Sequence, residues 1–244
     1  MKLKPAVKYQ IYQFKRPLLI YYLIIYVVFI FFIIENSSLT NQGVDARLGG
    51  IESASMIFIF IAGLNSFKET FKMFLQNGLS RKTLFISFVY SIIPISAVMA
   101  LIDSINGIIA SLVIKYDPAY LQFYSQRYVG SVSGILKYAE GFLWYIFAYA
   151  MLAMIGYFIT VLYYRMNKGL KLLVSIGFPT FFFIILPMID IDGAIYKGIG
   201  NFFSFAWGYK NGYNPYFSMV TCTLIFALFG GLSFLLIEKA AAKE

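Results

Sequence analysis

The feature that most constrains the fold of this chain is an apolar run over residues 17–34, which contains no charged residue and follows a lysine-studded segment. Eighteen residues in an α-helix rise about 27 Å, close to the ~30 Å thickness of a bilayer hydrocarbon core. Five further apolar runs follow along the chain. The sequence therefore predicts an all-α, polytopic membrane protein with six transmembrane helices.

Composition indicates that the chain has no room for a separate soluble domain. Of its 244 residues, 60% are hydrophobic and 13% are charged. Six spans of about 20 residues use half of this length, so we expect one transmembrane domain over residues 1–244. Pro179 and Pro187 predict a kink or a break in the fifth span, and the third can extend to Ile114. The predicted spans are residues 17–34, 51–67, 84–102, 141–164, 170–189 and 216–237.

The distribution of basic residues predicts the orientation. Fourteen of the 20 lysines and arginines fall in the two terminal segments and in the loops after the second and fourth spans. Short loops rich in lysine and arginine stay in the cytoplasm. We therefore expect a multi-pass protein of the plasma membrane with both termini in the cytoplasm, as an even number of spans requires.

The composition also excludes several functions. The net charge of +9 lies beside apolar runs, so it indicates a membrane surface and not a nucleic-acid partner. Because the chain has no histidine, histidine-dependent intramembrane enzymes and the usual histidine metal sites are excluded, and we expect no metal site. The sequence has no G-x-x-x-x-G-K-[ST] phosphate loop, so ATP hydrolysis by the usual route requires another chain. The single cysteine, Cys222, excludes a disulfide framework.

Residues 4–16 are predicted to form an interfacial helix. Val7, Ile11 and Phe14 share one stripe at 100° per residue, and lysines lie along its edge. Pro17 then suits a corner between this helix and the first span. A solvated basic tail is the alternative.

The loop after the second span carries the most specific local pattern. Over residues 67–77, apolar residues share one helical face and charged or polar residues share the other. A glycine then favours a helix stop, and a serine favours an N-cap for the third span. The pattern predicts a short amphipathic helix that either binds a groove on a soluble partner or simply returns the chain to the membrane. The residues assigned to this site are Phe67, Phe71, Phe74, Leu75, Gly78, Ser80 and Arg81.

The end of this loop, Gly78-Leu-Ser-Arg-Lys-Thr-Leu-Phe85, resembles the corresponding loop in the small permease subunits of the type-two, or export, class of ABC transporters. The layout of six spans, cytoplasmic termini and an interfacial helix is similar over the whole chain. The resemblance implies that residues 67–77 are a coupling helix that docks on a separate ATPase, and that the loop 165–171 makes a minor contact. Within the family, the chain most resembles the Gram-positive exporters of amphipathic peptides, such as the phenol-soluble modulin exporters and bacteriocin-immunity permeases.

Ionisable and tyrosine side chains in the spans are candidates for a transport pathway. A charge in hydrocarbon is costly, so Glu52, Asp103 and Glu140 must face protein, water or an interface. Asp103 with Asn106 is the better candidate for function, and hydration at the outer membrane boundary is the alternative. Tyrosine hydroxyls can line a pathway or tie helices together. The candidate pathway residues are Tyr21, Tyr22, Tyr26, Asp103, Asn106, Glu140, Tyr145 and Tyr149.

Two segments on the predicted outer side are unusually apolar. Residues 190–214 are predicted to dip back as a short re-entrant or interfacial helix, which the resemblance also implies. Residues 116–128 include Tyr120, Phe123 and Tyr124 and can cap the outer end of a pathway. An ordinary aromatic belt is the alternative.

Small residues predict where helices approach one another closely. Ala153 and Gly156 lie in the fourth span, and Ala227 and Gly231 lie four residues apart in the sixth. Such residues let two helix backbones approach within a membrane. We expect both spans to pack against neighbours at these positions.

Together these features predict the membrane subunit of an ABC exporter, acting as a homodimer or with a related permease. The chain is then not an enzyme and carries no cofactor, because ATP and Mg²⁺ bind two copies of a partner ATPase. The substrate is expected to be amphipathic or hydrophobic, such as a peptide toxin or antimicrobial peptide. Two alternatives remain: an ATP-independent immunity or sensor protein that binds an antimicrobial peptide, and the membrane subunit of an ABC importer. An intramembrane enzyme is disfavoured.

Overall fold

The computed structural model describes residues 3–41, 48–129, 134–189 and 193–238, and six of its helical stretches are long and apolar enough to cross a membrane. The prediction of an all-α membrane protein with six spanning helices is confirmed. The third span extends to Val113, one residue short of the limit of Ile114 that the sequence predicted. The helices are α1 (Leu3–Asn41), α2 (Ile51–Asn65), α3 (Lys68–Gln76), α4 (Arg81–Val113), α5 (Ala119–Tyr124), α6 (Gly134–Arg165), α7 (Lys168–Thr180), α8 (Leu186–Ile189), α9 (Ala194–Ala206) and α10 (Pro215–Glu238).

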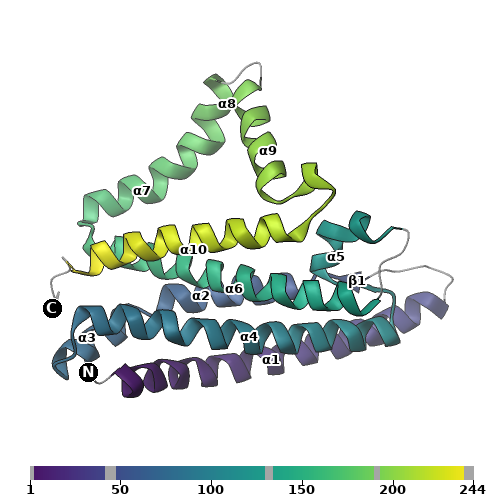
Figure 1. Ribbon diagram of the computed structural model, residues 1–244, viewed down its shortest axis with the longest axis horizontal. Coiled ribbons are helices and arrows are strands. Elements are labelled where there is room, and N and C mark those ends of the chain that lie inside the picture. Colours follow the sequence, from purple (N-terminus) through teal and green to yellow (C-terminus); the bar gives the residue numbers. More distant parts are fainter. Residues whose placement is uncertain (1–2, 42–47, 130–133, 190–192, 239–244) are drawn as a thin grey trace.

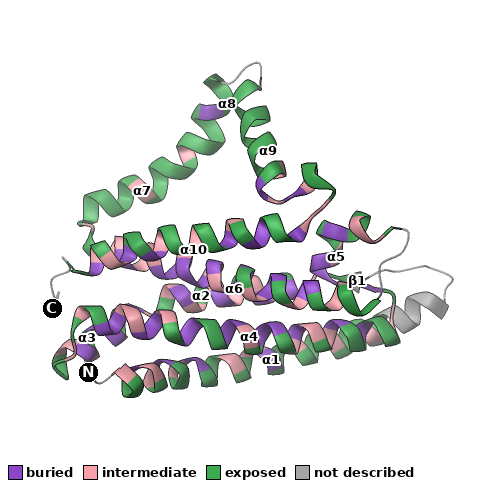
Figure 2. Ribbon diagram, in the orientation of Figure 1, coloured by how far each residue is buried: buried purple, intermediate pink, exposed green. Residues whose placement is uncertain are grey.

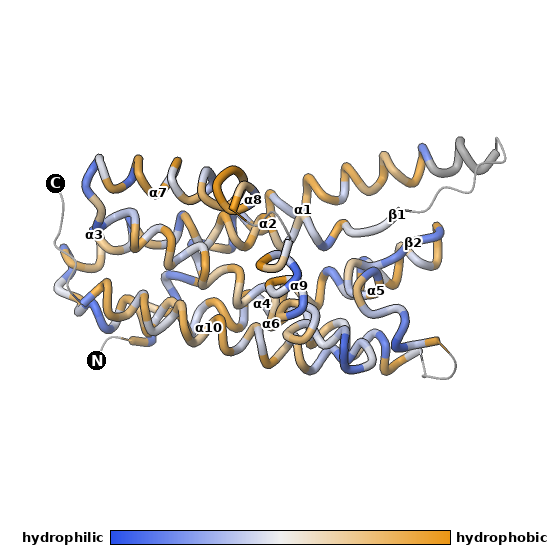
Figure 3. Tube along the Cα trace, turned by 90° about the horizontal axis from the view of Figure 1, so that it is seen from above, coloured by the Kyte–Doolittle hydropathy of each residue, from blue (hydrophilic) through white to orange (hydrophobic). Residues whose placement is uncertain are grey.

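The longer helices α1, α2, α4, α6 and α10 run alongside one another as a bundle (Figure 1). Helix α6 packs against α2, α4 and α10, and α1 packs against α4. The start of α1, the end of α10 and the short helix α3 lie at one end of the bundle, which we call the α3 end. The other end, the α5 end, holds α5 and the paired two-residue strands β1 (Leu48–Gly49) and β2 (Tyr116–Asp117). Hydrophobic residues follow the helices for most of their length (Figure 3).

The tightest packing in the bundle joins α2 to α6. A Cβ added to Gly63 would lie 2.3 Å from the carbonyl oxygen of Ala153, and one added to Gly156 would lie 2.3 Å from that of Phe60. The prediction that Ala153 and Gly156 form a close-packing site is therefore confirmed. The corresponding prediction for Gly231 is wrong, because a Cβ there would meet nothing within 4 Å.

Helix α1 runs without interruption through Pro17. Residues 4–16 are helical as expected, but the corner between an interfacial helix and the first span is absent. The reason is that the first turns of α1 already pack along α4. Gln10 Nε2 donates to Ser87 Oγ at 2.8 Å, and Ser91 Oγ donates to Gln10 Oε1 at 3.2 Å. Phe14 is buried on this same face.

Helices α7 and α9 stand away from the bundle. Together with α8 they form an inverted V above α10 in Figure 1, and Figure 2 shows them almost wholly exposed. Pro179 and Pro187 flank a π-helical turn, η2 (Phe181–Ile185), so the predicted irregularity of the fifth span is observed. Helix α9 supplies the helix expected within residues 190–214, of which 190–192 lie outside the described residues. In a membrane, the apolar faces of the V meet lipid or another chain.

Candidate functional site

Local sequence chemistry sets the bounds of α3. Gly78 follows the helix with φ of 69°, in the left-handed region that glycine tolerates. The Oγ of Ser80 then accepts a hydrogen bond from the Thr83 amide at 3.2 Å, which caps α4 as predicted. The result is a short helix held between the ends of α2 and α4.

The aromatic face of α3 points into the bundle. Phe67, Phe71 and Phe74 are buried, each at most 2% exposed. The Phe67 and Phe71 rings lie 5.4 and 5.5 Å from the ring of Tyr164 on α6, and Phe74 lies 5.9 Å from Tyr9 on α1. The interpretation of these phenylalanines as a docking face for a partner is therefore corrected. They anchor α3 to α6 and α1, because burying aromatic rings stabilises the helix in this position.

The opposite face of α3 is polar and exposed. It carries Lys68, Glu69, Lys72 and Gln76, while Leu75 is half-buried. Two further contacts tie this region to both ends of the chain. Thr70 Oγ1 donates to Gln13 Oε1 at 3.0 Å, and the Arg81 guanidinium donates to the carbonyl oxygen of Glu238 at 2.8 Å. Among the described residues of α3, the exposed ones therefore form its charged face.

A cleft of about 430 Å³ lies beside α3, between α1 and α2. Phe14, Phe58 and Ile61 are among its apolar lining residues, whereas Asn65 and Glu69 give it a polar side next to α3. The volume falls in the usual range for small-molecule sites, about 300–1,000 Å³. The cleft is thus amphipathic, with its polar part at the α3 end.

Asp103 lies at the centre of a buried cluster within the bundle. Its carboxylate is only 4% exposed and accepts hydrogen bonds from Tyr149 Oη on α6 at 2.6 Å and from Tyr22 Oη on α1 at 3.0 Å. The structure therefore brings three of the predicted pathway residues together. One carboxylate joins α1, α4 and α6, so Asp103 lies among protein groups and not at a hydrated boundary.

The remaining candidate tyrosines bind elsewhere. Tyr21 pairs with Ser55 at 2.7 Å, and Tyr26 donates to Asn106 Oδ1 at 3.4 Å on an exposed surface. Tyr145 Oη accepts the backbone N–H of Tyr120 at 3.0 Å. Each of these bonds ties one element to another, which fits the alternative that tyrosines hold the helices together.

Glu52 attaches residues 116–128, which we call the cap, to the first turn of α2. Its carboxylate is 3% exposed and accepts hydrogen bonds from Tyr116 Oη at 2.9 Å and from the Ala119 amide at 3.1 Å. Burial raises the pKa of Tyr116 well above its ordinary value, so this hydroxyl remains a donor. The start of the cap is therefore bound to a buried carboxylate.

Glu140 on α6 holds the other end of the cap. Arg127 donates to both of its carboxylate oxygens, at 2.9 and 3.1 Å, and Tyr128 donates to it as well. The hydrogen bonds to Glu140 raise the pKa of the Arg127 guanidinium, and burial raises the pKa of Tyr128 to about 12. Glu140 is 2% exposed, so it is a paired, buried carboxylate and not a hydrated one.

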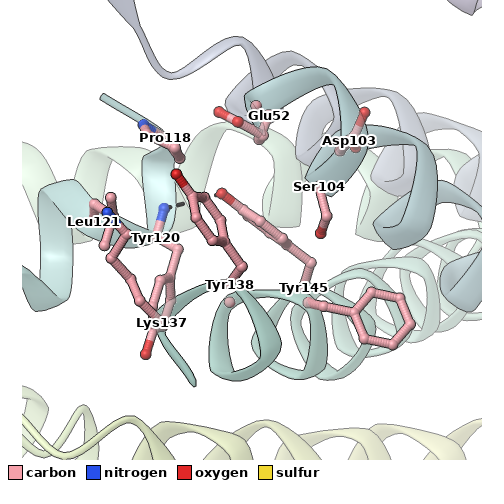
Figure 4. Close-up of a pocket in the computed structure, with 12 residues that line it drawn as sticks. Glu52, Asp103, Ser104, Pro118, Tyr120, Leu121, Lys137, Tyr138 and Tyr145 are labelled. Atoms are coloured by element: carbon pink, nitrogen blue, oxygen red, sulfur yellow. Dashed lines mark hydrogen bonds between the residues drawn. The ribbon is translucent and has the colours of Figure 1, made fainter. Parts of the chain in front are cut away.

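A small cavity lies beneath the cap, and Figure 4 shows the side chains around it. Glu52, Asp103, Ser104 and Tyr145 all line this space, whose volume is about 20 Å³. A second cavity of about 20 Å³, on the side of Tyr26, is also lined by Glu52 and Asp103. Each has room for about one water molecule. The described part of the chain holds no group of three metal-ligating side chains.

Sequence reasoning missed the partners of the carboxylates. Arg127 and Tyr128 end the cap, three and four residues after Tyr124, and Tyr116 begins it. The presence of an arginine in this aromatic segment was an available indication of an acidic partner, but no rule of sequence spacing pairs Arg127 with Glu140. Comparisons with protein families, curated proteins and solved structures find no match to this chain.

Proposed function

We propose that this chain is the membrane subunit of an ATP-driven exporter of the ABC permease type, and that it moves an amphipathic substrate. The observation that carries the proposal is α3. It is a short helix between two spans whose aromatic face is anchored in the bundle and whose charged face is open to a partner.

In this account the α3 end is cytoplasmic, because the loops at this end carry most of the basic residues. An ATPase docks on Lys68, Glu69, Lys72 and Gln76. Its movement passes through the buried rings of Phe67 and Phe71 to α6, and through Phe74 to α1. Anchored rings transmit displacement well, because a close-packed interior deforms little.

The amphipathic cleft beside α3 supplies inner access for the substrate in this proposal. Apolar parts of the substrate would lie against Phe14, Phe58 and Ile61, and its polar part would face Asn65 and Glu69. At the α5 end, the cap and its bonds to Glu52 and Glu140 would close the pathway. The exposed V of α7 to α9 offers a surface for a second permease subunit.

A second candidate is an ATP-independent membrane protein that binds an antimicrobial peptide. The observation that favours it is the small size of the cavities beside Asp103, each of which has room for about one water molecule. An exporter must then form its pathway between subunits or by moving helices. The two candidates differ in whether an ATPase is needed.

Purification from the native host in mild detergent tests the proposal. We expect a stoichiometric ATPase to copurify with the wild-type chain. Reversing charges on the open face of α3, with Lys68→Glu and Lys72→Glu, should abolish this association while leaving the chain folded. The matched control is Lys197→Glu with Lys210→Glu in the α9 region, which should retain the ATPase. A wild-type preparation without any ATPase, under conditions where known ABC complexes survive, would support the passive peptide-binding protein instead.

A further inference from the structure

A groove lies on the surface of the bundle toward the α3 end, between the first turns of α1 and the neighbouring part of α4. It has a volume of about 410 Å³ and is lined by Leu3, Lys4, Val7, Lys8, Ile11 and Tyr90. Four of these side chains give the groove an apolar lining, and the two lysines line it as well. No acidic side chain is among the lining residues.

The two lysines are available to bind an anion. Lys4 and Lys8 lie one helical turn apart on α1, and both are exposed. No described residue forms an ion pair with either of them. Two positive charges on one side of an apolar groove complement an anion that carries a hydrocarbon chain.

The position of the groove along the bundle corresponds to the edge of a membrane. Gln10 is bonded to Leu84 and Ser87, so the first turns of α1 lie level with the start of α4. Tyr90 is 60% exposed beside the groove, and tyrosine favours the boundary between headgroups and hydrocarbon. Basic pockets between transmembrane helices at this level bind anionic lipid headgroups.

We propose that this groove binds an anionic phospholipid. The phosphate lies between Lys4 and Lys8, and one acyl chain follows Val7, Ile11 and Tyr90 toward the interior of the membrane. The lipid would add to the hydrogen bonds of Gln10 that hold the first turns of α1 against α4. The site does not depend on the proposed transport function.

Native mass spectrometry of the delipidated full-length chain tests this site. Phosphatidylglycerol and phosphatidylcholine are titrated separately, and the bound lipids are counted for each chain. We expect one phosphatidylglycerol to bind more tightly than phosphatidylcholine. The double variant Lys4→Gln, Lys8→Gln should weaken this binding about 30-fold. The control Lys15→Gln, Arg16→Gln removes the same charge from the same helix outside the groove, and should change it less than about threefold.

A steric variant separates a lipid site from a simple anion site. Val7→Trp fills the groove and keeps both lysines, so it should also lose the tight phosphatidylglycerol. Equal weakening by the two charge variants would overturn the proposal in favour of diffuse surface attraction. Displacement of the lipid by inorganic phosphate alone, or a dimer that excludes lipid from the groove, would overturn it as well. Thermal unfolding of each variant in detergent verifies that loss of lipid is not loss of fold.

Discussion

Substitution of Gly156 by alanine tests the packing on which the bundle depends. The added Cβ would lie 2.3 Å from the carbonyl oxygen of Phe60, whereas ordinary contact begins at 3.4 Å. The nearest atoms belong to the backbone of α2, at Phe60, Gly63 and Leu64, and cannot rotate aside, so α2 and α6 must separate by about 1 Å. Overpacking of this kind costs about 1–3 kcal/mol, and we expect Gly156→Ala to destabilise the protein by this amount.

The assay is unfolding by SDS in mixed detergent micelles, followed by the loss of helical signal. The matched control is Gly231→Ala on α10, where an added Cβ meets nothing within 4 Å. Since alanine is better than glycine in a helix by about 0.5–1 kcal/mol, the control should be neutral or stabilising. If Gly156→Ala unfolds at the same SDS fraction as the wild type or at a higher one, the close approach of α2 and α6 is wrong.

Three further sets of substitutions test the assigned contacts. Asp103→Leu removes the acceptor of Tyr149 and leaves Tyr22 only the Met99 carbonyl oxygen, at 3.2 Å, so it should cost about 1–3 kcal/mol in the same assay. Asp103→Asn keeps one acceptor oxygen and should cost less, and equal losses would contradict the assigned bonds. Arg127→Met leaves the Glu140 charge buried and without its ion-pair partner, and should cost about 3 kcal/mol of unfolding free energy. Adding Glu140→Leu should recover part of that loss. If the double variant is as unstable as Arg127→Met, the ion pair does not stabilise the protein. Phe71→Asp should lower the yield of folded protein, measured by size-exclusion chromatography, because the Phe71 ring is fully buried. Lys72→Glu, on the exposed face, should leave the yield unchanged. Equal yields of the two variants would refute the anchoring of α3.

Much of the architecture follows from sequence periodicity and length. The apolar runs predicted six spans because a helix must satisfy its own backbone hydrogen bonds in hydrocarbon. Gly78 and Ser80 predicted the end of α3 and the start of α4 from turn and cap chemistry. Gly156 predicted a close approach because small residues let two helix backbones come together in a membrane, although the same reasoning failed at Gly231.

The sequence failed where the outcome depended on three-dimensional neighbours. The amphipathic pattern of residues 67–77 identified an apolar face, but not whether that face packs against the bundle or against a partner. In the structure it packs against the bundle, where it contacts the rings of Tyr9 and Tyr164. Pro17 suggested a corner, but Gln10 finds partners on α4 that hold α1 straight. The pairing of Glu140 with Arg127 depends on the fold of the cap, which no helical spacing reveals.

The most direct test of the central claim is site-specific photo-crosslinking from α3 in native membranes. A benzophenone amino acid replaces Lys72 on the open face, and the control replaces Lys210 near α9. The account predicts that light adds an ATP-hydrolysing subunit to the chain labelled at position 72 and none to the chain labelled at position 210. Absence of that product at position 72, from a chain that is folded and inserted, would contradict the assignment of α3 as the contact through which ATP drives transport.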